Sequence, residues 1–207
     1  MPSQNLPERN LPEGRPTREA AWELLCRYTE GESLRKHALA VEAAMRSYAS
    51  RYREDEEAWG IVGLLHDFDY ERWPGASDHP YRGSEILAAE GYPESWRRAI
   101  LAHASYTDVP RDTLMAKVLF AVDELCGFLT AVALVKPGRS LAEVDVHSVR
   151  KKLKEKGFAR SVNREEILQG PAELGVDFDE HVAFVIESLR ANAPALGLAG
   201  VTEPPAR

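Results

Sequence analysis

The chain has few cysteines and no long apolar run. Of its 207 residues only Cys26 and Cys126 are cysteines, and each lies in an apolar pattern typical of a helix. We therefore expect two buried free thiols rather than a disulfide, as in a reducing compartment. No apolar run approaches the roughly 20 residues of a membrane-spanning helix, and the N-terminal residues contain no stretch resembling a signal peptide. These absences predict a cytoplasmic protein with no membrane partner.

An excess of positive charge is also missing. The chain has 26 lysines and arginines against 33 aspartates and glutamates, which gives a formal net charge of −7 at pH 7. This balance disfavours a chain-wide interaction with nucleic-acid phosphates, although it allows a local basic patch. We therefore expect no DNA or RNA partner. The hydrophobic fraction of 44% suits a soluble domain with a sizeable core.

The period-two alternation of a β-strand is absent over any useful length. Apolar residues instead recur at three- and four-residue steps almost throughout residues 17–190, most clearly over 110–135, so the predicted fold class is all-α. Thr17 is a predicted N-cap. Ser140 with Glu143, and Asn163 with Glu166, are predicted capping boxes that open two further helices.

Proline and glycine clusters divide the chain. They predict a flexible N-terminal arm over residues 1–16 and a flexible tail over residues 193–207. Between them we predict a helical core over residues 17–135 and C-terminal helices over residues 136–192 that pack on that core.

The pair His66-Asp67 follows the apolar run of residues 61–65. An imidazole and a carboxylate at the end of a buried helix are costly to bury, unless both bind a metal ion. His37 lies upstream on the apolar face of one predicted helix, and Asp123 lies downstream within another. Taken alone, His37 could be a satisfied core histidine and Asp67 a helix-terminal carboxylate. Taken together, the four predict a metal site.

These four side chains offer nitrogen and oxygen ligands without a thiolate. Such a set suits a divalent ion, namely manganese, iron, cobalt, nickel, zinc or magnesium, with coordination positions left open for water or substrate. A closed structural zinc site fits poorly, because neither cysteine is placed to complete one.

The order His37, His66-Asp67, Asp123 resembles the HD superfamily of metal-dependent phosphohydrolases, which is named after that dipeptide. The resemblance covers about residues 34–129. It implies that the core is an HD-domain helical bundle, that these four residues bind one ion, and that the substrate is a phosphate ester of a nucleotide or a similar compound.

His79 and His103 extend this resemblance. In HD subgroups with two metals, additional histidines between the His-Asp pair and the last aspartate bind a second ion, and Asp67 would then bridge the two ions. The resemblance also reaches inositol oxygenase and an organophosphonate-cleaving oxygenase, which use six such ligands to hold two irons. The alternatives are that His79 caps its loop and that His103 packs near Tyr106. Residues 116–156 further resemble a group of uncharacterised predicted HD hydrolases that implies no substrate.

Two further residues are predicted to act in catalysis beside Asp67. Asp69 could orient the attacking water or take its proton. Lys117 precedes Asp123 by six residues, which places it about 120° away around the helix, and it could neutralise phosphate charge. The alternatives are an exposed turn carboxylate and a solvated lysine. Tyr70 and Trp73 could wall a pocket.

We therefore predict a metal-dependent phosphohydrolase that cleaves a small phosphate ester, with nucleotides as the first class, through a metal-activated water. One alternative is a di-iron oxygenase built on the same ligands. Another is a regulatory HD module that binds a nucleotide without turnover, although a complete ligand set argues against it.

Overall fold

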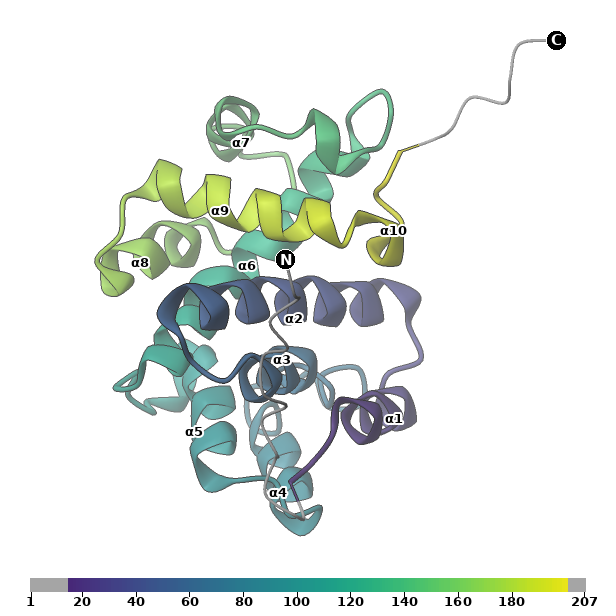
Figure 1. The fold of residues 1–207 in the computed structure, drawn as a ribbon, viewed down its shortest axis with the longest axis vertical. Coiled ribbons are helices and arrows are strands. Elements are labelled where there is room, and N and C mark those ends of the chain that lie inside the picture. Colours follow the sequence, from purple (N-terminus) through teal and green to yellow (C-terminus); the bar gives the residue numbers. More distant parts are fainter. Residues whose placement is uncertain (1–14, 201–207) are drawn as a thin grey trace, which may run out of the picture.

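The computed structural model describes residues 15–200, and this part of the chain is all-α as predicted, without a β-strand (Figure 1). Of the predicted arm, residues 1–14 lie outside the described residues. The elements in chain order are α1 (Arg18–Tyr28), α2 (Glu32–Tyr52), α3 (Glu56–Leu65), α4 (Tyr81–Ala89), α5 (Glu94–His103), the 3₁₀ helix η1 (Ser105–Thr107), α6 (Leu114–Leu134), the 3₁₀ helix η2 (Leu141–Glu143), α7 (Val146–Leu153), α8 (Arg164–Leu174), α9 (Phe178–Ala191) and α10 (Ala193–Leu196). No helix among residues 15–200 is both long enough and apolar enough to cross a bilayer.

Side-chain caps fix where several helices begin. Thr17 caps α1, as predicted, and Asn163 caps α8, each by accepting hydrogen bonds from backbone N–H groups of the first turn. The predicted capping box of Asn163 with Glu166 does not close, because the carboxylate of Glu166 accepts from Ser105. The prediction that Ser140 opens a further helix through a capping box is wrong, because only the three residues of η2 follow it. The carboxylate of Glu143 accepts from the N–H of Gly138 instead of turning back to Ser140, so the box does not close.

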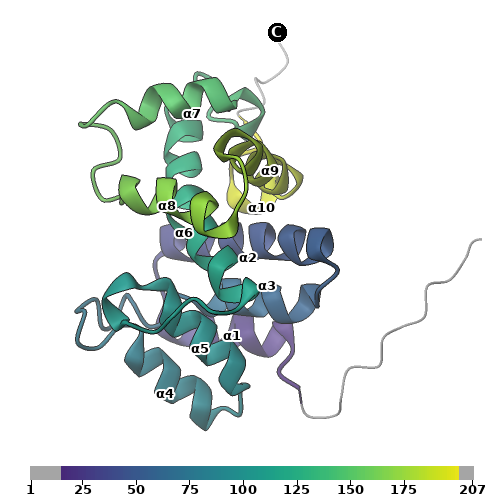
Figure 2. The same cartoon turned by 90° about the vertical axis from the view of Figure 1, so that its left-hand side faces the viewer.

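The helices form two halves that meet along α2 and α6. In Figure 1, α1, α3, α4 and α5 lie below α2, whereas α7 to α10 lie above it. α2 packs against both α3 and α6, and α6 packs against both α5 and α8. Figure 2 shows α6 passing from the lower half into the upper half. A residue on α6 can therefore meet side chains from both halves.

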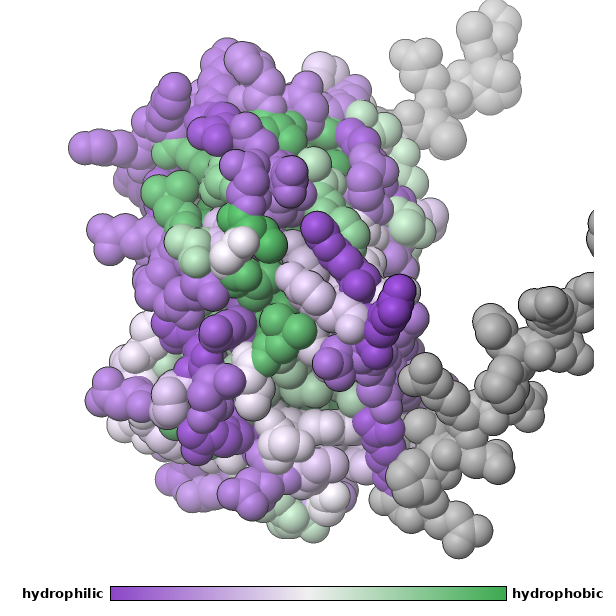
Figure 3. All heavy atoms as spheres, turned by 60° about the vertical axis from the view of Figure 1, so that its left-hand side comes forward, coloured by the Kyte–Doolittle hydropathy of each residue, from purple (hydrophilic) through white to green (hydrophobic). Residues whose placement is uncertain are grey.

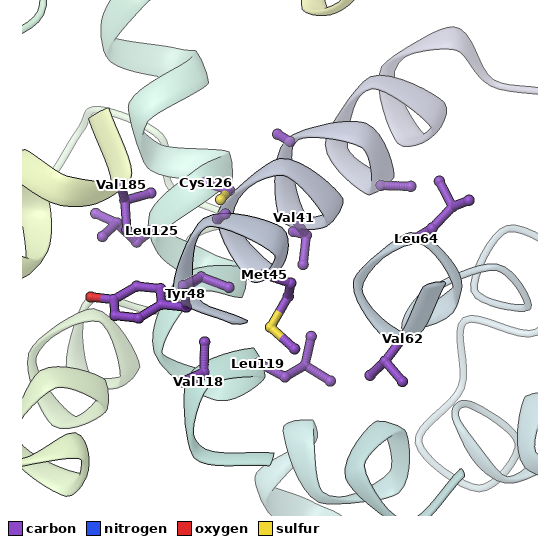
Figure 4. Packing of buried hydrophobic residues seen from close by; sticks show 14 of the residues in the cluster. Val41, Met45, Tyr48, Val62, Leu64, Val118, Leu119, Leu125, Cys126 and Val185 are labelled. Atoms are coloured by element: carbon purple, nitrogen blue, oxygen red, sulfur yellow. The ribbon is translucent and has the colours of Figure 1, made fainter. Parts of the chain in front are cut away.

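The core is continuous between the halves, because α2 presents apolar side chains on two sides. Val41 and Met45 lie on the side of α2 that faces α3, the helix that carries Leu64, and Leu125 of α6 lies near Val185 of α9 (Figure 4). All five are buried. The face shown in Figure 3 is mostly hydrophilic, and its apolar residues gather in a limited band. Cys126 is buried and free, as predicted, whereas Cys26 is free but only partly buried.

The tail does not begin at residue 193 as predicted. Residues 193–196 form α10, and Leu196 and Leu198 are buried in the core. The carbonyl of Leu198 accepts a hydrogen bond from the N–H of Leu141, which fixes the segment against η2. Proline and glycine dominate the composition here, but two leucines suffice to bury the segment. Residues 201–207 lie outside the described residues.

Candidate metal centre

Four of the predicted ligands converge at the junction of α2, α3 and α6. His37 lies on α2, His66 caps the end of α3 with Asp67 next to it, and Asp123 lies on α6. Nε2 of His37 lies 3.0 Å from Oδ1 of Asp123 and 3.2 Å from Nε2 of His66. Nε2 of His66 lies 3.3 Å from Oδ1 of Asp123 and 3.5 Å from Oδ2 of Asp67. The four donor atoms thus lie within 4.8 Å of one another, a spacing that a single ion can span.

A second group of donors adjoins the first and shares Asp67. Nε2 of His79 and Nε2 of His103 each lie 3.3 Å from Oδ1 of Asp67. The other oxygen of that carboxylate, Oδ2, is the one nearer to His66. The two oxygens of Asp67 therefore face two different groups, and the structure brings together all six residues that the sequence predicted as ligands.

Hydrogen bonds orient three of the imidazoles. Nδ1 of His66 donates to the carbonyl of Gly63, and Nδ1 of His103 donates to the carbonyl of Ile100. Nδ1 of His79 lies 2.8 Å from Oδ1 of Asp69. Because the acceptors fix the proton on Nδ1, each Nε2 presents its lone pair toward the carboxylates and the other histidines. Neutral imidazoles and carboxylates that converge in this way direct lone pairs to a common point, so this donor set fits a divalent metal.

Asp69 lies behind His79 and does not face the substrate side. Its side chain is buried, and its Oδ2 accepts a hydrogen bond of 2.7 Å from the N–H of Gly83. A Cβ atom at Gly83 would lie 2.9 Å from the carboxylate carbon of Asp69, so glycine allows this close approach. The predicted role of Asp69 in orienting the attacking water gains no support from this position, whereas a role in orienting His79 does.

Lys117 does not line the space above the ligands. It lies on the part of α6 near Glu173 of α8, where Arg111 first and Lys117 to a smaller extent lower the pKa of the Glu173 carboxyl. The predicted contact between Lys117 and a phosphate therefore gains no support from the structure, because the helix turns this side chain away from Asp123.

A cavity of about 470 Å³ opens above the ligands. Its floor contains five of the six predicted ligands, all except His66. Its walls come from both halves of the molecule and include Tyr70, Ser105, Tyr106, Glu124, Gly127, Ser161, Val162, Asn163 and Glu166. Tyr70 was predicted as a wall residue. Trp73 is not one, because it packs near Tyr28 instead.

Sequence reasoning missed part of this wall. The side chain of Asn163 caps α8 as predicted, but the carboxylate of Glu166 accepts a hydrogen bond of 3.0 Å from Ser105 of η1. Ser105 and Glu166 are separated by 61 residues. No local sequence pattern signals such a contact, since it depends on how α8 packs on α6.

The carboxylates of the site change the pKa values of their neighbours. Burial alone would lower the pKa of His66, but the carboxylates of Asp67 and Asp123 outweigh burial and raise it well above its ordinary value. Burial likewise opposes the protonation of His79, yet Asp67 and Asp69 raise its pKa to about 9. Burial and the charge of Asp123 raise the pKa of the Glu124 carboxyl to about 7. All three raised pKa values mean that the site favours additional positive charge, either a proton or a cation.

The two remaining histidines lie outside the site. His147 of α7 is exposed. His181 of α9 is buried and acts in packing, because it hydrogen bonds to Tyr48 and to the carbonyl of Ala121.

Comparison with known protein families agrees with this geometry. The model of the HD domain matches residues 34–127, a segment that contains all six converging side chains. No curated protein and no solved structure matches the chain. The chain thus carries an HD domain over residues 34–127, and its converging histidines and aspartates lie within that domain as groups that could hold a metal ion.

Proposed function

We propose that this protein is a metal-dependent phosphohydrolase that cleaves a small phosphate monoester. The observation that carries the proposal is the pair of donor groups that share Asp67 beneath an open cavity. His37, His66, Asp67 and Asp123 would hold one ion, and Asp67, His79 and His103 would hold a second. The imidazole ligands favour manganese, iron, cobalt, nickel or zinc over magnesium, which prefers oxygen ligands.

A divalent ion bound here would lower the pKa of a coordinated water and withdraw electron density from a phosphoryl oxygen. In the hydrolysis, the oxygen of water forms a bond to phosphorus, the ester P–O bond breaks, and the alcohol leaves with a proton. The protein's own contribution would be the two donor groups, which would place the ions, and with them the phosphoryl group, at the floor of the cavity.

The cavity walls would bind the alcohol part of the substrate. Tyr106 is fixed by a hydrogen bond of 3.1 Å from its hydroxyl to the carbonyl of His79. Tyr70 packs with its ring 5.2 Å from the ring of His79. Both tyrosines line the cavity, and an aromatic ring can stack on a planar base. Nucleotides therefore stay within the proposed substrate class, as the sequence predicted.

The test begins with protein purified without added metal. Elemental analysis gives the metal content, and phosphate release is then measured under nitrogen on nucleoside monophosphates and other small phosphate monoesters, with manganese, cobalt or nickel. We expect phosphate release by the wild type. Asp67→Ala should lose both metal and turnover, because Asp67 belongs to both donor groups. Asp78→Asn, a change in the loop before His79 that leaves the six donors intact, is the control and should retain both.

Three results would contradict the proposal. Full metal content in Asp67→Ala would remove the metal assignment. In a parallel assay in air, turnover that consumes oxygen would select the di-iron oxygenase. Tight nucleotide binding without any product would select the regulatory module.

A further inference from the structure

The cavity above the metal ligands contains carboxylates but no basic anchor for phosphate. Four carboxylates line it, namely those of Asp67, Asp123, Glu124 and Glu166, and no lysine or arginine of residues 15–200 does. Asp67 and Asp123 belong to the donor groups, whereas Glu124 and Glu166 lie in the wall. The cavity therefore differs in charge from a site that binds polyphosphates through basic side chains.

In each of the two wall carboxylates, one oxygen accepts a hydrogen bond from the protein. Oε2 of Glu124 accepts a hydrogen bond of 3.1 Å from the N–H of Asn163. Oε1 of Glu166 accepts one of 3.0 Å from the hydroxyl of Ser105. Arg111 influences Glu166 only from a distance, because its guanidinium forms two hydrogen bonds of 2.8 Å with Glu173. Within the described chain, Glu124 and Glu166 thus form no ion pair, and each keeps a second oxygen for a ligand.

Tyrosine rings lie beside these carboxylates. Tyr70 and Tyr106 line the cavity and are 41% and 50% exposed, which is unusual for such large side chains and leaves ring surface for a ligand. Tyr81 is also exposed and lies near enough to Tyr106 to raise its pKa, although burial and the carboxylates of Asp67 and Asp69 contribute more. The face of a tyrosine ring attracts a cation that lies within about 6 Å.

The sum of charges indicates which substrates such a cavity can bind. Two bound divalent ions would carry a charge of +4, which the four lining carboxylates balance when all of them are ionised. A phosphate monoester dianion then adds −2 with no basic side chain to offset it, and a di- or triphosphate adds more. A positive charge in the alcohol part offsets this excess, and it would lie where Glu124, Glu166 and the tyrosines can contact it.

We propose that Glu124, Glu166, Tyr70 and Tyr106 select phosphate monoesters whose alcohol carries an ammonium group. Such substrates would be preferred over neutral esters and over nucleoside polyphosphates, and this proposal rests on the proposed function. Hydrolysis of such a compound consumes one water and releases inorganic phosphate and the free amino alcohol.

A matched pair of substrates tests the selection directly. Phosphocholine carries a trimethylammonium group, and 3,3-dimethylbutyl phosphate replaces its nitrogen by carbon at nearly the same shape and without the charge. Phosphoethanolamine and propyl phosphate form a second pair, and AMP and ATP represent nucleotides. We expect kcat/KM for the charged member of at least one pair to exceed that of its neutral partner by about tenfold or more, as for a desolvated cation between carboxylates and aromatic rings.

Variants locate the selection in the wall. Glu166→Gln keeps the hydrogen bond from Ser105 and removes the charge, so the ratio of kcat/KM between charged and neutral partners should fall toward one. Glu165→Gln is the matched control, because Glu165 is the neighbouring residue in the first turn of α8, is exposed and does not line the cavity. It should leave the ratio as in the wild type. Metal content is measured for each variant, so that a loss of ions is not mistaken for a loss of selection.

The outcomes separate this proposal from the proposed function. Phosphate release with equal kcat/KM for both members of both pairs, or faster release from ATP than from any charged monoester, would overturn the ammonium proposal and leave the phosphohydrolase intact. An unchanged ratio in Glu166→Gln would also overturn it. If the wild type releases phosphate from none of these compounds, both the ammonium proposal and the proposed phosphohydrolase function are contradicted.

Discussion

A histidine can present only one ring nitrogen to a metal, and the partner of the other nitrogen decides which one. At His66 and His103 that partner is a backbone carbonyl of the helix turn that precedes the histidine. At His79, which lies in a loop, the partner is the buried carboxylate of Asp69. The orientation of His79 therefore depends on a side chain that mutation can change.

Replacing Asp69 with asparagine should weaken the binding of the second ion, the one that we propose lies between Asp67, His79 and His103. The N–H of Gly83 can only donate, so the amide oxygen would turn toward Gly83 and the NH₂ group toward Nδ1 of His79. Nδ1 must then accept, which moves the proton to Nε2 and blocks ligation. We expect the affinity for the second ion to fall by about 10–100-fold, measured by calorimetric titration and elemental analysis.

The control for this change is Asp78→Asn, since the Asp78 carboxylate pairs with Arg82 and not with a ligand. The first ion should remain in both variants, because Asp69 contacts none of its four ligands. Equal affinity for two ions in Asp69→Asn and the wild type would contradict the role of Asp69.

His181 couples stability to pH away from the metal. Burial lowers its pKa to about 4, and the neutral ring accepts from the hydroxyl of Tyr48 and donates to the carbonyl of Ala121. In the unfolded chain its pKa is about 6.5. As the pH falls from 6.5 to 4, the unfolded chain therefore takes up a proton that the folded protein refuses, and the free energy of unfolding decreases by up to about 3 kcal/mol.

His181→Gln should flatten this part of the pH dependence, because the glutamine amide can make similar hydrogen bonds and does not titrate. Urea unfolding of wild type and variant at pH 7.5, 5.5 and 4.5 measures the difference, in which the contributions of all other groups cancel. Parallel curves for the two proteins over this range would show that His181 is not the group responsible.

At the scale of elements, the crossing of α8 over α6 sets the width of the cavity. An added Cβ at Gly170 of α8 would lie 2.5 Å from Cα of Ala121, so the helices meet backbone to backbone. Ala121 lies two residues before the predicted ligand Asp123 on α6. Glu166, which lines the cavity, lies in the first turn of α8. The glycine that allows close helix packing therefore also places the cavity wall over the ligands.

Gly170→Ala should destabilise the protein by about 1–3 kcal/mol, because two backbones cannot separate without disturbing their neighbours. This overpacking outweighs the gain in helix propensity of about 1 kcal/mol. The matched control is Gly127→Ala on α6, where an added Cβ would lie no closer than 3.9 Å to other atoms. Denaturant unfolding should show a loss for the first variant only, and equal stability of both would contradict the close crossing.

At the scale of the molecule, the donor groups join elements that are far apart in sequence. The predicted ligands lie on α2, at the end of α3, in the loop before α4, at the end of α5, and on α6. An ion that binds only when these elements are in place stabilises the folded state as a whole, by about 2.7 kcal/mol at a hundredfold excess over its Kd.

Removing metal with a chelator should lower the melting temperature by about 5–10 °C, since 1 kcal/mol corresponds to about 2–4 °C for a chain of this size. Differential scanning calorimetry with and without manganese measures the shift. Asp67→Ala should melt at the same temperature in both conditions, and the absence of any shift in the wild type would contradict a shared metal centre.

The amino-acid sequence alone determined the helical class and the candidate ligands. Helical periodicity is local, and caps such as Thr17 and Asn163 act within one turn, so both can be predicted without tertiary contacts. The order of His37, His66-Asp67 and Asp123 gave the HD resemblance, which the family match over residues 34–127 confirms. Composition misled only where two leucines bury the segment after residue 193.

Tertiary structure alone decided what surrounds the ligands. Asp69 lies behind His79, Lys117 lies outside the cavity, and Glu166 meets Ser105 across 61 residues. None of these placements follows from local spacing, because each depends on the crossing of helices whose contacts are non-local. The candidate ligands could be found in the sequence because a metal site requires particular donor atoms, whereas the charge and shape of the cavity arise only when the two halves of the molecule pack together.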